Sequence, residues 1–218
     1  MQTLTVPVNQ IKIRGDLRCP KNSTLLVIIV LGERNERYYN QFIQLRDILN
    51  EYTIATFFVP ELLTQDEKRI AANRFDETLL ADRLIQITSQ LRSLPETKEL
   101  QFSYLGLSNV ADRIFRAVSI LKGEIESLVL IGDGLPPLNM VFSEISVLNI
   151  LGELDFKSIE SNQIFLNQIH TPLKRLYLIP GTHSHFDEPQ KWKLVSKTVL
   201  RWFNSPENRN LEFAQSNV

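Results

Sequence analysis

Cysteine is nearly absent from this sequence, since Cys19 is the only one among 218 residues. One thiol cannot form an internal disulfide or supply a multi-cysteine zinc site. An excess of charge of one sign is also lacking, because 24 lysines and arginines are matched by 25 aspartates and glutamates, which leaves a formal net charge of −1. A balanced chain lacks the basic surplus that is typical of proteins that bind nucleic acid or anionic membranes. We therefore expect no nucleic-acid partner.

Long hydrophobic runs are missing too. The longest one, at 25–32, is far shorter than the roughly 20 residues that a membrane-spanning helix needs. The first ten residues have no basic start followed by an apolar stretch, so no secretory signal is expected. The length and the 43% of hydrophobic residues suit one soluble domain. We predict a cytoplasmic protein without membrane insertion, with a single domain at 1–204 and a C-terminal tail at 205–218.

Short apolar runs, mostly β-branched or aromatic, recur along the chain. They lie at 25–32, 53–60, 100–106, 127–134, 145–152 and 173–181. Runs of this kind are typical of strands buried on both faces of a sheet. A further stretch alternates polar and apolar residues on both sides of Asn9-Gln10, which predicts an antiparallel hairpin.

Amphipathic stretches separate the apolar runs. The two clearest place the following residues on one helix face: Leu80, Leu84, Ile87 and Leu91, and then Trp192, Val195, Val199 and Trp202. Strands that alternate with helices predict an α/β protein with a mostly parallel central sheet flanked by helices. The antiparallel hairpin would then form an N-terminal edge of that sheet.

A serine follows one of the predicted strands. The run that ends at Gly106 continues as Leu107-Ser108-Asn109-Val110 and then as an amphipathic stretch. A nucleophile elbow has the pattern G-x-S-x-G at such a strand–turn–helix junction, and the N–H after the serine, here that of Asn109, can bind an oxyanion. Val110 replaces the second glycine. Taken alone, Ser108 is more often a helix N-cap.

An acid and two histidines follow later predicted strands. Asp155 comes after the run at 145–152, and His183 and His185 come after the run at 173–181. Serine, acid and histidine, each at the carboxyl end of its own strand, is the chain order of an α/β-hydrolase triad. Taken singly, Asp155 could cap a helix, and the histidines could be ordinary loop residues. No third ligand accompanies the two histidines, so no metal is predicted.

With these motifs, the chain resembles the dienelactone-hydrolase-like branch of the α/β-hydrolase family, from about Val8 to Phe203. The segments that carry the resemblance are IRGDLRCP, LLVIIVLG, RFDETLLADRL, PETKEL, GLSNV, GELD and IPGTHSHFDEP. The resemblance implies the α/β-hydrolase fold and hydrolysis of esters or lactones by a Ser-His-Asp triad, with no cofactor. The short connections leave no room for a large lid, which suits small esters, lactones or thioesters.

The chain also departs from the family pattern. Relatives carry a His-Gly after the first long strand, whereas this chain has a charged loop at 32–37. Backbone N–H groups near Gly32 and Glu33 are the expected second half of an oxyanion hole whose first half is Asn109. In the usual G-x-x-H-x-F-x-E-P loop, the histidine position falls on Ser184, between the two histidines of this chain.

Two functions therefore stay open. In the first, Ser108 attacks a small-molecule carbonyl, His183 or His185 is the base, and Asp155 orients the imidazole. In the second, the fold is kept but catalysis is impaired, the charged loop fills the site, and the protein binds a protein partner.

Overall fold

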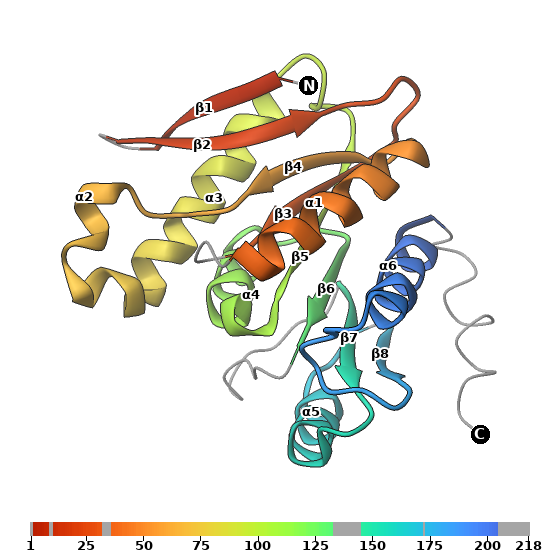
Figure 1. The fold of residues 1–218 in the computed structure, drawn as a ribbon. Coiled ribbons are helices and arrows are strands. Elements are labelled where there is room, and N and C mark those ends of the chain that lie inside the picture. The colour runs from red at the N-terminus through yellow and green to blue at the C-terminus, as the bar shows by residue number, and fades with distance from the viewer. Residues whose placement is uncertain (1, 9–10, 32–35, 133–144, 172, 205–218) are drawn as a thin grey trace.

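One eight-stranded sheet organises the protein, in the order β1-β2-β4-β3-β5-β6-β7-β8 (Figure 1). This computed structural model describes residues 2–8, 11–31, 36–132, 145–171 and 173–204. The strands are β1 (Gln2–Val8), β2 (Ile11–Arg18), β3 (Leu25–Val30), β4 (Ala55–Val59), β5 (Gln101–Leu107), β6 (Ser127–Ile131), β7 (Ser146–Gly152) and β8 (Lys174–Ile179). All pairs from β4 to β8 are parallel, and the pairs β1–β2 and β2–β4 are antiparallel. The predicted sheet with its antiparallel edge hairpin is confirmed.

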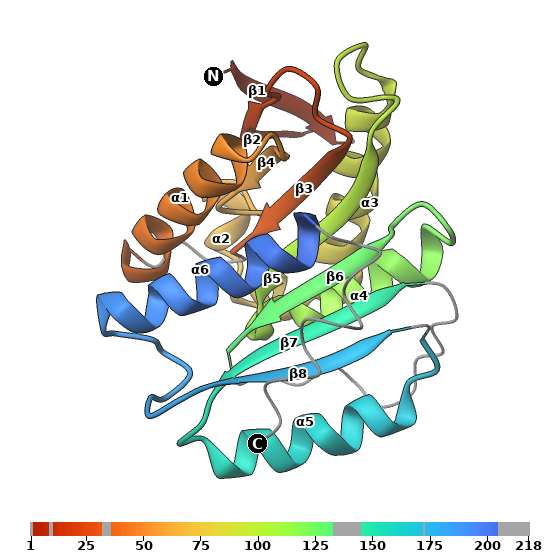
Figure 2. The ribbon, with the colours of Figure 1, turned by 90° about the vertical axis from the view of Figure 1, so that its right-hand side faces the viewer.

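Helices cover both faces of the sheet (Figure 2). They are α1 (Glu36–Glu51), α2 (Gln65–Lys68), α3 (Glu77–Ser93), α4 (Ala111–Ile120), α5 (Phe156–Gln168) and α6 (Pro189–Asn204), with 3-10 turns η1 (Ala71–Phe75) and η2 (Ser108–Val110). Apolar side chains of α3, α4 and α5 pack in one core cluster, and those of α1 and α6 pack in the other.

The burial of β3 explains why its sequence has no polar residue. Leu26, Ile28 and Val30 belong to the cluster on one face, and Val27 and Ile29 belong to the cluster on the other. Because successive side chains of a strand point to opposite faces, a strand covered on both sides must be apolar throughout. The predicted helix faces are buried as well, with Leu84, Ile87 and Leu91 of α3 fully enclosed.

One part of the structure was not predicted, and one part of the prediction is not tested by the described residues. The short elements α2 and η1 have no counterpart in the sequence pattern, and they fill the connection between β4 and α3. The predicted tail at 205–218 lies outside the described residues, so the single-domain boundary at 204 stays a prediction. In the part of the chain that the structure describes, no helix has the length and hydrophobicity to cross a bilayer.

Candidate active site

Ser108 lies directly after β5, where the chain turns into α4. Its side chain is buried, and its hydroxyl donates a hydrogen bond to the backbone oxygen of Gly132, with 2.6 Å between the two oxygens. The N-cap residue of α4 is Val110, whose side chain makes no capping bond. The interpretation of Ser108 as a helix cap is therefore wrong, and its hydroxyl instead links the carboxyl ends of β5 and β6.

The valine in place of the second glycine is accommodated by the first glycine. A Cβ at Gly106 would lie 2.7 Å from Cδ1 of Ile114 and 2.9 Å from Cγ2 of Val110. The side chains of Val110 and Ile114 thus occupy the space above Gly106. The described non-glycine residues with positive φ are confined to Asn22, Thr53 and Phe186, so the turn at Ser108 forms without left-handed backbone.

His183 is the histidine that pairs with the predicted acid. Its Nδ1 lies 2.7 Å from Oδ1 of Asp155, and the backbone N–H of Ser184 donates to Oδ2 at 2.5 Å. Burial raises the pKa of Asp155, but the hydrogen bonds from Ser184 and His183 outweigh it, so that pKa lies below its ordinary value. Asp155 occupies the N-cap position of α5 without a capping bond, because its carboxylate instead contacts His183 and Ser184. These two residues belong to the loop between β8 and α6, at 180–188, which we call the histidine loop.

The loops after β7 and β8 are joined along their lengths. Ser184, which occupies the family's histidine position, is buried, and its hydroxyl oxygen accepts the N–H of Gly152 at 2.9 Å. A Cβ at Gly152 would lie only 2.3 Å from the carbonyl carbon of His183. With this close approach, the Ser184 side chain points into the protein. The side chain of the preceding residue, His183, points outward, and 65% of it is exposed.

His185 contacts a residue that the sequence analysis did not identify. Its Nδ1 lies 2.9 Å from the hydroxyl oxygen of Tyr38, in the first turn of α1. Tyr38 also lines a cavity of about 100 Å³ at Ser108, together with Leu107, Asn109, Ile131 and Gly132. One signal for Tyr38 exists in the sequence, because it lies near the start of the helix that follows the apolar run at 25–32, and that helix begins at the same edge of the sheet.

The predicted site residues are brought together only in part. Among the described residues, neither imidazole is hydrogen-bonded to Ser108, whose hydroxyl instead bonds to Gly132. Asn109 is exposed and lines the Ser108 cavity. Gly32 and Glu33, the other expected oxyanion-hole residues, lie outside the described residues.

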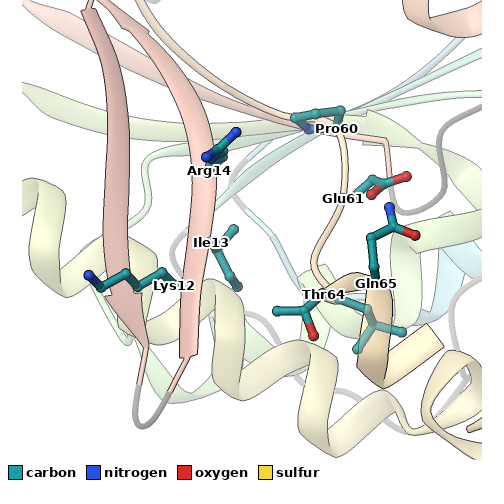
Figure 3. Close-up of a pocket in the computed structure, with 8 residues that line it drawn as sticks. Lys12, Ile13, Arg14, Pro60, Glu61, Thr64 and Gln65 are labelled. Carbon is teal, nitrogen blue, oxygen red and sulfur yellow. The ribbon is translucent and has the colours of Figure 1, made fainter. Parts of the chain in front are cut away.

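A larger cavity of about 340 Å³ lies elsewhere, between β2 and the segment after β4. It is lined by Ile13 and Arg14 on one side and by Pro60, Glu61 and Thr64 on the other (Figure 3). None of the candidate catalytic residues lines it. Over the described ranges, no group of three or more His, Cys, Asp or Glu side chains is arranged to hold a metal ion. The smaller cavity at Ser108 is therefore the candidate active site.

The comparisons with known proteins point to the same family as the sequence motifs. No protein-family model matches the chain. The structure is similar to dienelactone hydrolase from Anabaena variabilis, with a TM-score of 0.80 and 28% identity over 93% of this chain and 95% of that one. This chain has the α/β-hydrolase fold and is similar to dienelactone hydrolase over most of its length. The protein Est1E from Butyrivibrio proteoclasticus shares the fold at 15% identity, with a TM-score of 0.70 over 92% of this chain and 97% of that one.

Curated relatives of this α/β-hydrolase-fold chain occur in two strains of Mycobacterium tuberculosis. Both are provisionally named phosphoribosyl transferases and are 30% identical to it over 206 residues. The match covers 93% of this chain but 46% of theirs, so the chain spans about half the length of those relatives. Their name describes a protein about twice as long as the shared part and does not assign an activity to that part.

Proposed function

We propose that the protein is a serine hydrolase of small esters, lactones or thioesters, acting in the cytoplasm. The observation that carries the proposal is the 2.7 Å contact between Nδ1 of His183 and Oδ1 of Asp155. An imidazole whose Nδ1–H is held by a carboxylate keeps Nε2 as the basic nitrogen, which a general base requires. This pair lies at the carboxyl edge of the sheet, where Ser108 follows β5.

The proposed mechanism uses the three predicted residues in separate roles. Ser108 Oγ attacks the carbonyl carbon while Nε2 of His183 takes its proton, and Asp155 stabilises the imidazolium. His183 returns the proton to the leaving group and then activates the water that releases the acyl group from Ser108. The N–H of Asn109 and an N–H near Gly32 would bind the oxyanion.

Reaction requires Ser108 to change its hydrogen-bond partner. In the structure, its hydroxyl donates to Gly132, so the side chain must rotate toward His183 before proton transfer. Side-chain rotations are fast, and catalytic hydrogen bonds are often long or absent in enzymes without substrate. The cavity of about 100 Å³ is smaller than pockets for drug-sized ligands, which favours substrates with a short acyl group.

A specific observation also supports the second candidate function, a catalytically impaired protein that acts as a binding module. The Ser108 hydroxyl is buried and donates to a backbone oxygen at 2.6 Å, which is how a purely structural serine behaves. In that case the His183–Asp155 pair would only hold together the loops after β7 and β8.

Labelling by a fluorophosphonate probe, together with turnover of p-nitrophenyl acetate, separates the two candidates. The hydrolase proposal predicts labelling and turnover in the wild type and the loss of both in Ser108→Ala. Ser119→Ala is the matched control, because its hydroxyl bonds a backbone oxygen near the other end of α4. A wild-type protein with neither labelling nor turnover on acetyl esters, small lactones or thioesters would contradict the hydrolase proposal.

A further inference from the structure

The pair formed by Tyr38 and His185 has no role in the mechanism proposed above. Their 2.9 Å contact joins two residues that are 147 positions apart in the chain. Within the described residues, no carboxylate contacts His185, in contrast to His183, which has Asp155. The two neighbouring histidines therefore stand in different environments, and only His183 has the partner that a triad base needs.

The position of Tyr38 is fixed by the packing of its ring, and a separate contact joins α1 to the histidine loop. The Tyr38 ring packs against the core cluster that contains Leu107 and Ile131. One turn later, Gln41 donates a side-chain hydrogen bond to the backbone oxygen of Phe186 at 3.2 Å. Phe186 itself is buried, so the histidine loop is anchored on α1 beside the Ser108 cavity. A phenol held this firmly can act on a bound molecule without losing much side-chain entropy.

We propose that Tyr38 is a catalytic residue whose hydroxyl donates a hydrogen bond to the substrate carbonyl oxygen as it becomes an oxyanion. His185 is the positioning residue of the pair, because its Nδ1–H donates to the phenol oxygen and directs the phenol hydrogen toward the cavity. Both protons stay on their own atoms throughout. The inference rests on the proposed hydrolase function and adds a side-chain donor to it.

The surroundings of the cavity make such a donor effective. Tyr38 and Ser108 line the same cavity of about 100 Å³, so a carbonyl attacked by Ser108 lies within the space that Tyr38 borders. Leu107 and Ile131 form apolar walls, and hydrogen bonds to developing charge are stronger in such surroundings than in water. Tyrosine hydroxyls are among the donors that stabilise oxyanions in enzymes.

The first test removes the phenol hydroxyl alone. Tyr38→Phe should lower kcat for p-nitrophenyl acetate roughly 10- to 100-fold, the size expected for one hydrogen bond to a charged group, and should change KM less than about threefold. Tyr39→Phe is the matched control, because the same hydroxyl is removed from the next residue, whose ring packs edge-on against Phe58 at 5.4 Å. Gln41→Leu removes the other contact between α1 and the histidine loop. Both controls should keep kcat within about threefold.

The second test addresses the positioning role of His185. His185→Leu should lower kcat about as much as Tyr38→Phe, whereas His185→Asn, which keeps an N–H donor near the Nδ1 position, should restore most of it. Combining His185→Leu with Tyr38→Phe should add little further loss, because the two residues act as a unit. Thermal unfolding of each variant shows whether the fold is kept. Since His185 is exposed, its variants still test the inference if Tyr38→Phe fails to fold.

The outcomes separate this inference from the proposed function. Wild-type turnover with an unchanged kcat in Tyr38→Phe and His185→Leu would overturn the role of the pair and leave the hydrolase proposal intact. Equal losses in Tyr38→Phe and Gln41→Leu would also overturn it, since they would show that Tyr38 only anchors the loop. A wild-type protein with neither labelling nor turnover would overturn both.

Discussion

Gly152→Ala is the substitution whose effect follows most directly from the geometry of the site. The added Cβ would lie 2.3 Å from the carbonyl carbon of His183 and 2.4 Å from the backbone oxygen of Thr182. Ordinary van der Waals contact begins at 3.4 Å. Because both neighbours are backbone atoms, no side chain can rotate away, and the histidine loop must move by about 1 Å.

The displacement sets the size of the expected effect. A misplacement of about 1 Å at a catalytic group can lower the rate roughly 10²-fold, so kcat should fall by about that factor. Overpacking of this kind typically lowers the free energy of unfolding by about 1–3 kcal/mol. The N–H of Ser184, which is donated to Asp155, should also exchange with solvent faster, because the displaced loop loses that hydrogen bond.

Gly181→Ala is the matched control in the same loop. Its nearest neighbour would be Nζ of Lys191 at 3.5 Å, so the new methyl group has space, although the positive φ of 59° strains an alanine. That strain lowers the free energy of unfolding by about 1–2 kcal/mol without pushing His183 away from Asp155. Urea denaturation, amide exchange and p-nitrophenyl acetate turnover measure the three effects. If Gly152→Ala keeps wild-type turnover and Ser184 protection, the argument from the close approach is refuted.

Three further predictions follow from the same structure. Asp155→Asn should lower kcat about 10⁴-fold while the protein stays folded, because the amide no longer stabilises the His183 imidazolium, and turnover together with circular dichroism checks both parts. The lowered pKa of Asp155 means that its contribution to stability is fully present above its unfolded pKa and is lost as the pH falls through its folded pKa. Urea denaturation should therefore show a difference in unfolding free energy between wild type and Asp155→Asn that shrinks in acid, below about pH 4, and a pH-independent difference would contradict this. Trp202→Ala, at a fully buried position of α6, should lower the free energy of unfolding by about 3–5 kcal/mol, whereas Phe156→Ala, at a side chain that is 74% exposed, should change it by less than about 0.5 kcal/mol.

The order and type of the main elements could be predicted because burial leaves a local trace in the sequence. A strand covered on both faces must be apolar at each position, as β3 is, and a helix that covers a sheet must be apolar at every third or fourth residue. The same logic placed Ser108, Asp155 and the histidine loop at one edge, because the carboxyl ends of parallel strands meet there. The helix α2 was not predicted, because its four residues are too few to show a periodic pattern and none of them is buried.

What the sequence alone determined about this protein is therefore its sheet, its helices and the edge at which its candidate site lies. The tertiary structure decided which histidine faces the acid. Ser184 is buried against Gly152 at the end of β7. With Ser184 in this position, His183 contacts Asp155 and His185 contacts Tyr38. The tertiary structure also determined the partner of the Ser108 hydroxyl, which is the backbone oxygen of Gly132, directly after β6. These contacts join residues that are far apart in the chain, and they form only when the strands and loops pack together. For that reason, no local periodicity of the sequence encodes them.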